Sequence, residues 1–386
     1  MAFHKLLADE LFDGYTLSKQ ERVLILAEDG TVQGLVPSED AGEGIRRLSG
    51  ILVPGLVNCH CHLELSHLRN RIPEKTGLLR FVSTVMAERA ADEEEVFSAI
   101  ASAEEEMRQG GIVAVGDICN TSLTGRQKAA GNLHYHSFVE ATGFDPRMAG
   151  HRFEHCRLIA TQLADHPGVR PETISIVPHA PYSVSDELWN SIVGLPGNRL
   201  LSMHNQETPA ENELFRDGTG EWLKLYEQLS IDTSRFRPTG QSSLQSVLPR
   251  FKPSQSVILV HNVETSADDL QLAAASGLDL SWCLCPNANL YISGVLPPVE
   301  LLVRGNCRIV IGTDSLASNQ GLGILAELKM LRHHFPRLPL SWMLKWATLN
   351  GAEALHLESL LGSFDPGKRP GVTLISSDLE KSTRIL

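Results

Sequence analysis

Four consecutive residues of this chain, Cys59-His60-Cys61-His62, belong to the two residue types that most often bind zinc. The preceding apolar run, residues 51–57, predicts a buried strand. Alternate side chains of a strand point to opposite faces, so the two histidines share one face and the two cysteines share the other. One pair can face a site while the other packs. Two ligands do not complete a metal site, so the choice depends on partners elsewhere.

The elements that must position these residues form an alternating pattern. Strand-like runs alternate with helical stretches, which is typical of a parallel sheet with crossover helices. Eight such units predict an α/β fold with a (β/α)8 TIM barrel over residues 51–362. Residues 1–50 and 363–386 contain further strand-like runs, and we expect them to form a small β-sandwich domain. The eight barrel strands are predicted at 51–58, 111–117, 133–140, 173–178, 199–204, 256–261, 278–284 and 307–313.

Polar residues with metal-binding side chains recur where these predicted strands end. In barrels of this kind the chemistry lies at the C-terminal ends of the strands. Five such residues lie there in order, which indicates a metal site assembled from across the fold. We therefore expect the histidine pair to face the site and Cys59 and Cys61 to pack behind it. The five residues are His60, His62, His204, His261 and Asp314.

Four segments resemble one known family. "PGLVNCHCHLE", "HNQET", "LVHN" and "GTDSLASN" are similar to the amidohydrolase superfamily, and most similar to its cytosolic deaminase and chlorohydrolase branch. The resemblance implies that His60, His62, His204 and Asp314 hold one divalent metal, zinc by preference and Fe2+ as the alternative. Two-metal branches carry a bridging lysine at strand 4. Here that strand ends "IVPHAPY", without a lysine.

The resemblance also implies catalytic roles. The metal would lower the pKa of a bound water towards about 7, which makes hydroxide available at neutral pH. Glu207, in the H-x-x-E motif, would carry a proton to a ring nitrogen, as a buried carboxyl with a raised pKa can. His261 would hold the attacking water, and Asp314 would accept its proton as well as bind the metal.

Five further residues are predicted to bind substrate. His179 lies at the mouth of strand 4, with a structural role as the alternative. Glu140 ends strand 3, and a substrate contact or a structural ion pair are both open. Ser315 and Asn287 lie in loops that shape the pocket, and Glu64 begins the segment that we expect the substrate tail to pass.

The predicted reaction is hydrolytic deamination of a heteroaromatic small molecule. The loops most resemble aminodeoxyfutalosine deaminases, which implies a 6-aminopurine nucleoside. Adenosylhomocysteine and methylthioadenosine deaminases usually read G-T-D-G where this chain has Ser315. They remain the alternative, together with chlorohydrolases, cyclic amidohydrolases and a catalytically silent ligand-binding relative. No P-C-x-x-C motif occurs, which excludes the cytidine-deaminase type of zinc site.

Composition narrows the class of partner. The 386 residues carry a formal net charge of −12, which argues against nucleic acid and anionic membranes as partners. The N-terminus lacks the apolar core of a secretory signal. Seven scattered cysteines, an odd number, fit reduced thiols in a cytoplasm. The oligomeric state stays open, with a homodimer as one option.

Overall fold

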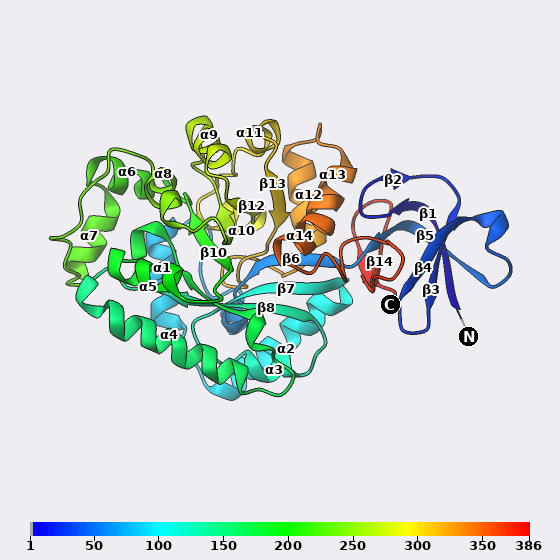
Figure 1. The fold of residues 1–386 in the computed structure, drawn as a ribbon, viewed down its shortest axis with the longest axis horizontal. Coiled ribbons are helices and arrows are strands. Elements are labelled where there is room, and N and C mark those ends of the chain that lie inside the picture. The colour runs from blue at the N-terminus through cyan, green and yellow to red at the C-terminus, as the bar shows by residue number, and fades with distance from the viewer. Residues whose placement is uncertain (1–2) are drawn as a thin grey trace.

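The computed structural model describes residues 3–386 and has two regions, a small all-β sheet beside a larger α/β body (Figure 1). The small sheet joins the two ends of the chain, with strand order β15-β14-β5-β1-β3-β4 and β2 paired to β1. Its strands are β1 (Phe3–Phe12), β2 (Leu17–Ser18), β3 (Arg22–Ala27), β4 (Val32–Pro37), β5 (Ile45–Pro54), β14 (Val372–Ile375) and β15 (Ser382–Arg384).

The terminal segments therefore combine in space as predicted, but the sandwich is corrected to one hydrogen-bonded sheet. The reason lies in β5, which pairs with β1 in parallel on one side and with β14 antiparallel on the other. This long strand joins the two chain ends into one continuous sheet. It also carries the sheet to Pro54, past the predicted boundary at residue 50.

The larger region contains eight parallel strands in two four-stranded sheets, ordered β6-β7-β8-β9 and β10-β11-β12-β13. Each predicted barrel strand has a counterpart among them. Their bounds are β6 (Leu56–Cys61), β7 (Ile112–Cys119), β8 (His134–Ala141), β9 (Ile174–Pro178), β10 (Leu200–Asn205), β11 (Ser256–His261), β12 (Asp279–Leu284) and β13 (Arg308–Ile311).

Backbone contacts link the two sheets at both edges. Between β9 and β10, the His204 amide donates to the His179 carbonyl at 2.9 Å. Between β6 and β13, the Thr313 amide donates to the His60 carbonyl at 2.9 Å, and a parallel bridge pairs Cys61 with Asp314. These contacts bring the ends of the first, fifth and eighth strands towards one another.

The first predicted strand, 51–58, is in fact two strands. Its first half belongs to β5 in the small sheet, and its second half begins β6 in the parallel sheet. The break falls at Gly55, where an added Cβ would lie 2.3 Å from Val113 Cγ1 and 2.5 Å from the Pro370 carbonyl oxygen. Only glycine fits where two backbones approach so closely.

Helices surround the parallel strands, and an apolar core fills the space between them (Figure 1). In α2, Asp92 caps the N-terminus by accepting from the Glu94 amide. Within residues 3–386, none of the helices has the length and apolar character that a membrane crossing requires. The helices are α1 (Leu78–Glu88), α2 (Glu93–Gln109), α3 (Gly125–Ala129), α4 (Ala149–Ala164), α5 (Asp186–Gly194), α6 (Pro209–Asp217), α7 (Glu221–Gln228), α8 (Ser243–Val247), α9 (Ala267–Ala275), α10 (Pro286–Ile292), α11 (Val299–Arg304), α12 (Ile324–His334), α13 (Leu340–Trp346) and α14 (Leu349–Ala354).

Candidate active site

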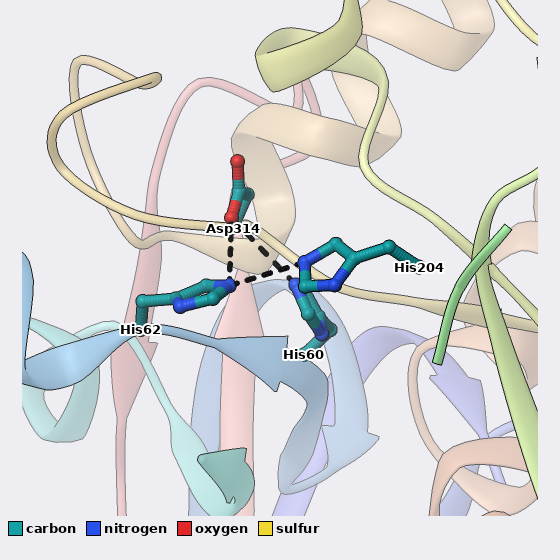
Figure 2. A group of neighbouring side chains, drawn as sticks. All are labelled: His60, His62, His204 and Asp314. Atoms are coloured by element: carbon teal, nitrogen blue, oxygen red, sulfur yellow. Dashed lines mark hydrogen bonds and ion pairs between the residues drawn. The ribbon is translucent and has the colours of Figure 1, made fainter. Parts of the chain in front are cut away.

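Four side chains that could bind a metal meet at the ends of β6, β10 and β13. We call these four residues, His60, His62, His204 and Asp314, the ligand group. Figure 2 shows three imidazoles and one carboxylate facing a common point. Asp314 Oδ1 lies 3.6 Å from His60 Nε2 and 3.4 Å from His62 Nε2. His62 Nε2 lies 3.3 Å from His204 Nε2. One ligand atom from each of the four lies within 4.8 Å of the others, so the four predicted residues lie together, and their role as metal ligands stays a prediction.

The cysteines of the opening motif lie outside this group. Cys59 Sγ contacts the Gly351 carbonyl oxygen at 3.8 Å, on the side of α14. Burial raises the pKa of the Cys61 thiol well above its usual value, which keeps it protonated at neutral pH. A protonated thiol is a poor metal ligand, because the thiolate is the binding form.

The chemistry of the four-residue group fits a divalent cation. His60 is fully buried, and neither ring nitrogen has a hydrogen-bond partner in the described chain. A buried polar group left without a partner is costly, and a cation at this point would remove that cost. Burial lowers the pKa of His60, and it lowers the pKa of His62 to about 4. Both imidazoles are therefore neutral, which is the form that binds metal.

His204 is oriented by acceptors behind it. Its Nδ1 lies 3.0 Å from the His179 carbonyl oxygen and 3.3 Å from Glu140 Oε1. Both partners accept hydrogen bonds, so Nδ1 carries a proton, and Nε2 faces the other three groups. Burial opposes protonation, but Glu140 above all raises the pKa of His204 to about 9. Metal binding must therefore displace a proton from this imidazole.

Asp314 is held in a strained backbone conformation three positions after the end of β13. Its φ is 59°, in the left-handed region that non-glycine residues rarely adopt. Ser318 Oγ donates to Oδ2 at 2.6 Å, which leaves Oδ1 facing the histidines. Burial would raise the pKa of Asp314, but the surrounding histidines lower it well below its usual value. The group is an ionised carboxylate.

Glu207 and His261 lie beside this group. Glu207 Oε1 is 3.8 Å from His261 Nε2, and both side chains are buried. Burial raises the pKa of Glu207 to about 8, so its carboxyl can carry a proton at neutral pH. The other ring nitrogen of His261, Nδ1, lies 3.2 Å from Nδ2 of the Asn289 side chain. The site thus combines a candidate cation position, a protonated carboxyl and an oriented imidazole.

Comparison with known proteins decides the family. Residues 51–384 match the model of the Amidohydrolase family. The chain belongs to the amidohydrolase family. This membership, with the deaminase names of its relatives, makes the protein a hydrolase acting on carbon–nitrogen bonds. Members of this family use a divalent metal, and the cluster of His60, His62, His204 and Asp314 could hold one.

Three relatives of this amidohydrolase indicate the range of its neighbours. A 5-methylthioadenosine/S-adenosylhomocysteine deaminase of Teredinibacter turnerae is 28% identical over 361 residues, covering 86% of this chain and 73% of the relative. The Helicobacter pylori aminofutalosine deaminase structure, in complex with methylthio-coformycin, shares the fold with a TM-score of 0.82 at 20% identity, covering 97% and 92% of the two chains. A zinc-bound adenosine deaminase of Xanthomonas campestris has a TM-score of 0.72 at 20% identity, covering 96% and 84%.

Two residues predicted to bind substrate lie against the ligand group of the amidohydrolase. Glu140 contacts His204 and also accepts from the Asn120 side-chain Nδ2 at 3.2 Å. The His179 ring centroid lies 4.8 Å from that of His204, and its Nδ1 contacts Ser183 Oγ at 2.6 Å. Burial lowers the pKa of His179 to about 4. Their role towards substrate stays a prediction.

The other three predicted residues contact protein groups. The buried Glu64 carboxylate accepts from the backbone amides of 120 and 121, from the Thr121 hydroxyl and from Arg89. Ser315 Oγ contacts Ser318 Oγ at 3.0 Å. The Asn287 amide donates to Glu327 Oε2 at 2.9 Å. These contacts shape the loops around the site, and direct substrate contact by these three residues stays a prediction.

The structure places three further groups behind the predicted site residues, and two of them, Ser318 and Glu211, were not predicted from the sequence. Asn289 contacts His261, Ser318 donates to Asp314, and Glu211 accepts from the backbone at Glu207. Asn289 belongs to "CPNANLY", two positions from the predicted Asn287, which is a local signal. Ser318 and Glu211 follow their partners by four positions, a spacing that carries no specific signal outside a helix.

Proposed function

We propose that this protein is a hydrolytic deaminase of a 6-aminopurine nucleoside. The observation that carries the proposal is the meeting of Glu207, His261 and the four-ligand group at one buried point. Deamination of a ring carbon needs an activated water and an acid that protonates the ring nitrogen. The side chains at this point include groups suited to both tasks.

We infer that His60, His62, His204 and Asp314 hold one divalent cation, with zinc as the first candidate and Fe2+ as the alternative. Three imidazoles and one carboxylate are ligands suited to zinc. The bound cation would supply Lewis acidity that lowers the pKa of a water to about 7. The name of the zinc-bound Xanthomonas campestris neighbour supports the choice of metal.

The protein groups move the protons. Glu207, protonated at neutral pH because burial raises its pKa to about 8, gives its proton to N1 of the purine as water adds at C6. His261 orients that water, and Asp314 takes its proton. The proton held by Asp314 then passes to the exocyclic amine, which leaves as ammonia, and the C6 hydroxyl proton returns to Glu207 while N1 keeps its proton. One water is consumed, and the C6 amine is replaced by an oxo group.

We also infer that the two four-stranded sheets form one (β/α)8 barrel. The backbone links between β9 and β10 and between β6 and β13 support this inference. In a barrel, the ends of all eight strands lie on one face, and active sites occupy that face. A purine would then lie over the ligand group, with its N9 tail directed towards Glu140 and His179.

Aminodeoxyfutalosine is our first candidate substrate, on the resemblance of "ELSHL", "ETPAENELFRDGTG" and "GTDSLASN" to that branch. Methylthioadenosine and adenosylhomocysteine form the second candidate, supported by the name of the Teredinibacter turnerae relative. In either case the tail should contribute to rate, because remote contacts position the reacting ring. Free adenine should therefore be a far poorer substrate than the nucleoside.

The test is ammonia release by the zinc-loaded protein from adenine, adenosine, methylthioadenosine, adenosylhomocysteine and aminodeoxyfutalosine. Guanine and a chlorotriazine serve as controls for the other amidohydrolase reactions. The highest kcat/KM with aminodeoxyfutalosine supports the first candidate, and a lead for methylthioadenosine or adenosylhomocysteine supports the second. Ammonia from none of the 6-aminopurines rejects the deaminase proposal.

A further inference from the structure

The turn that carries Glu207 has an unfavourable backbone. Gln206 follows β10 directly and has a φ of 49°, in the left-handed region. A non-glycine residue is held there only when its surroundings outweigh the strain. Glu207 comes next in the chain, so the direction of its carboxyl depends on what holds this turn.

Glu211 holds the turn from the first turn of α6. Its Oε1 accepts from the Gln206 amide at 2.9 Å, and its Oε2 accepts from the Glu207 amide at 3.3 Å. Glu211 is fully buried. Both oxygens of one carboxyl group therefore accept hydrogen bonds from two consecutive backbone amides.

Ordinary helix capping does not explain this arrangement. Thr208 is the N-cap of α6, and Glu211 stands three residues later, the spacing of a capping box. A capping-box glutamate reaches back to the amide of the N-cap residue itself. Here Glu211 reaches past Thr208 to the two residues before it, while the Thr208 hydroxyl caps nothing and is buried without a partner in the described chain.

The opposite side of the turn is tied to the loop after His261. The Gln206 side chain accepts from Thr265 Oγ1 at 2.8 Å and donates to Asp269 Oδ2 at 3.1 Å. The Gln206 carbonyl accepts from the Glu264 amide at 2.9 Å. The turn is thus clamped between Glu211 and the segment that follows β11.

We propose that Glu211 is a positioning residue of the reaction, which acts by holding the Gln206–Glu207 turn so that the Glu207 carboxyl faces the reacting ring. This inference deepens the proposed function and rests on the role given there to Glu207. Glu211 touches neither the ligand group nor the substrate. Its removal should lower turnover without removing the metal.

The experiment compares zinc-loaded Glu211→Gln and Glu211→Ala with Glu213→Gln, the same change at an exposed position of the same helix. Glutamine keeps one acceptor oxygen, so it should lose less kcat than alanine. We expect kcat to fall by about 10-fold to 100-fold, as for other residues whose hydrogen bonds orient a functional side chain. Zinc content and KM should stay near wild type, and Glu213→Gln should match wild type throughout.

A second comparison separates positioning from a general structural role. Because Glu211 acts through Glu207, adding Glu211→Gln to Glu207→Gln should cause little further loss of kcat. A structural role predicts instead that the two losses multiply and that zinc content falls. Either of those results, or wild-type kcat in Glu211→Ala, overturns the proposal.

Crystal structures of Glu211→Ala and Glu213→Gln supply a readout that needs no substrate. We expect the Gln206–Glu207 turn to change in Glu211→Ala while the four metal ligands keep their positions. An unchanged turn in that variant overturns the proposal. If the wild-type protein deaminates no 6-aminopurine, the proposed function fails separately, and the structures still decide whether Glu211 holds the turn.

Discussion

The ring nitrogens His62 Nε2 and His204 Nε2 lie 3.3 Å apart, although 142 positions separate the two residues in the chain. His204 keeps its proton on Nδ1, where the His179 carbonyl and Glu140 accept it. Its Nε2 therefore presents a lone pair once metal binding displaces the second proton of this imidazole. A cation between the two nitrogens would bind both lone pairs at once. The negative charge of the Asp314 carboxylate, whose Oδ1 lies 3.4 Å from His62 Nε2, favours a cation at this position.

Removal of one ligand should remove the metal. His60→Ala leaves three of the four ligands, and we expect most of the metal and all of the activity to be lost. The matched control is Cys61→Ser, which changes a neighbouring residue outside the ligand group and should keep its metal. Metal content measured by mass spectrometry checks both variants. Full occupancy in folded His60→Ala protein contradicts the assignment.

Glu140→Gln tests whether Glu140 supports His204. The carboxylate lies 3.3 Å from Nδ1, and its charge raises the basicity of that imidazole. We expect metal affinity to fall by about 10-fold to 100-fold, as for other partners of metal-bound histidines. Competition with a chelator measures this, with exposed Glu154→Gln as the control. A rise in KM at unchanged metal affinity points instead to the substrate contact predicted from the sequence.

Glu207→Gln should keep the metal and lose turnover. Glutamine preserves the shape of the side chain but cannot deliver a proton. General acid–base groups contribute about 10²-fold to 10⁴-fold, so kcat should fall within that range. Steady-state kinetics with measured zinc content checks the prediction. Near wild-type turnover would place the proton transfer elsewhere, with His261 as the next candidate.

A buried ion pair that does not belong to the ligand group should contribute to stability. Lys128 Nζ lies 2.6 Å from Asp117 Oδ2, and both side chains are almost fully buried. Asp117 also accepts from the Leu63 amide at 3.0 Å, next to His62. Lys128→Ala leaves an unpaired buried carboxylate and should lower the free energy of unfolding by about 3–5 kcal/mol.

Chemical denaturation measures this loss, with exposed Lys345→Ala as the control. Lys128→Met with Asp117→Asn removes both charges and should regain part of the stability, since a buried pair can often be replaced by uncharged groups. Equal stability of Lys128→Ala and Lys345→Ala contradicts the expected role of the pair.

Glu327 should give the protein a measurable pH dependence of stability. Burial raises the pKa of this carboxyl from 4.5 to about 7. Between these values the folded state binds a proton that the unfolded state does not, so the free energy of unfolding falls as pH rises. The contribution of Glu327 to the free energy of unfolding is fully present below pH 4.5, and this contribution is lost as the pH rises through 7.

Glu327→Gln lacks this titration, so its stability should fall less than that of wild type between pH 5 and 8, by up to about 3 kcal/mol. The difference between the two proteins at each pH, from urea denaturation, isolates the one group. Exposed Glu300→Gln is the control and should follow the wild-type slope. Parallel slopes for Glu327→Gln and wild type contradict the prediction.

Local patterns in the chain were enough to predict the ligand types and their order along the strands. A strand shows its period over a few residues, so the shared face of His60 and His62 and their distinction from Cys59 and Cys61 could be read directly. The motifs around His204, Glu207, His261 and Asp314 likewise indicated a metal-dependent hydrolase, which family membership confirms.

Long-range contacts depended on the closed tertiary structure. Residue spacing does not reveal that β5 joins both chain ends in one sheet. Nor does it reveal that Val113 and Pro370 leave no room for a side chain at position 55, because those partners lie far along the chain. The same holds for Glu140 behind His204. The turn at Gln206 is short-range but irregular, and no periodic pattern encodes its φ of 49° or its clamp by Glu211. Side-chain hydrogen bonds in such turns depend on directions that only the packed fold determines.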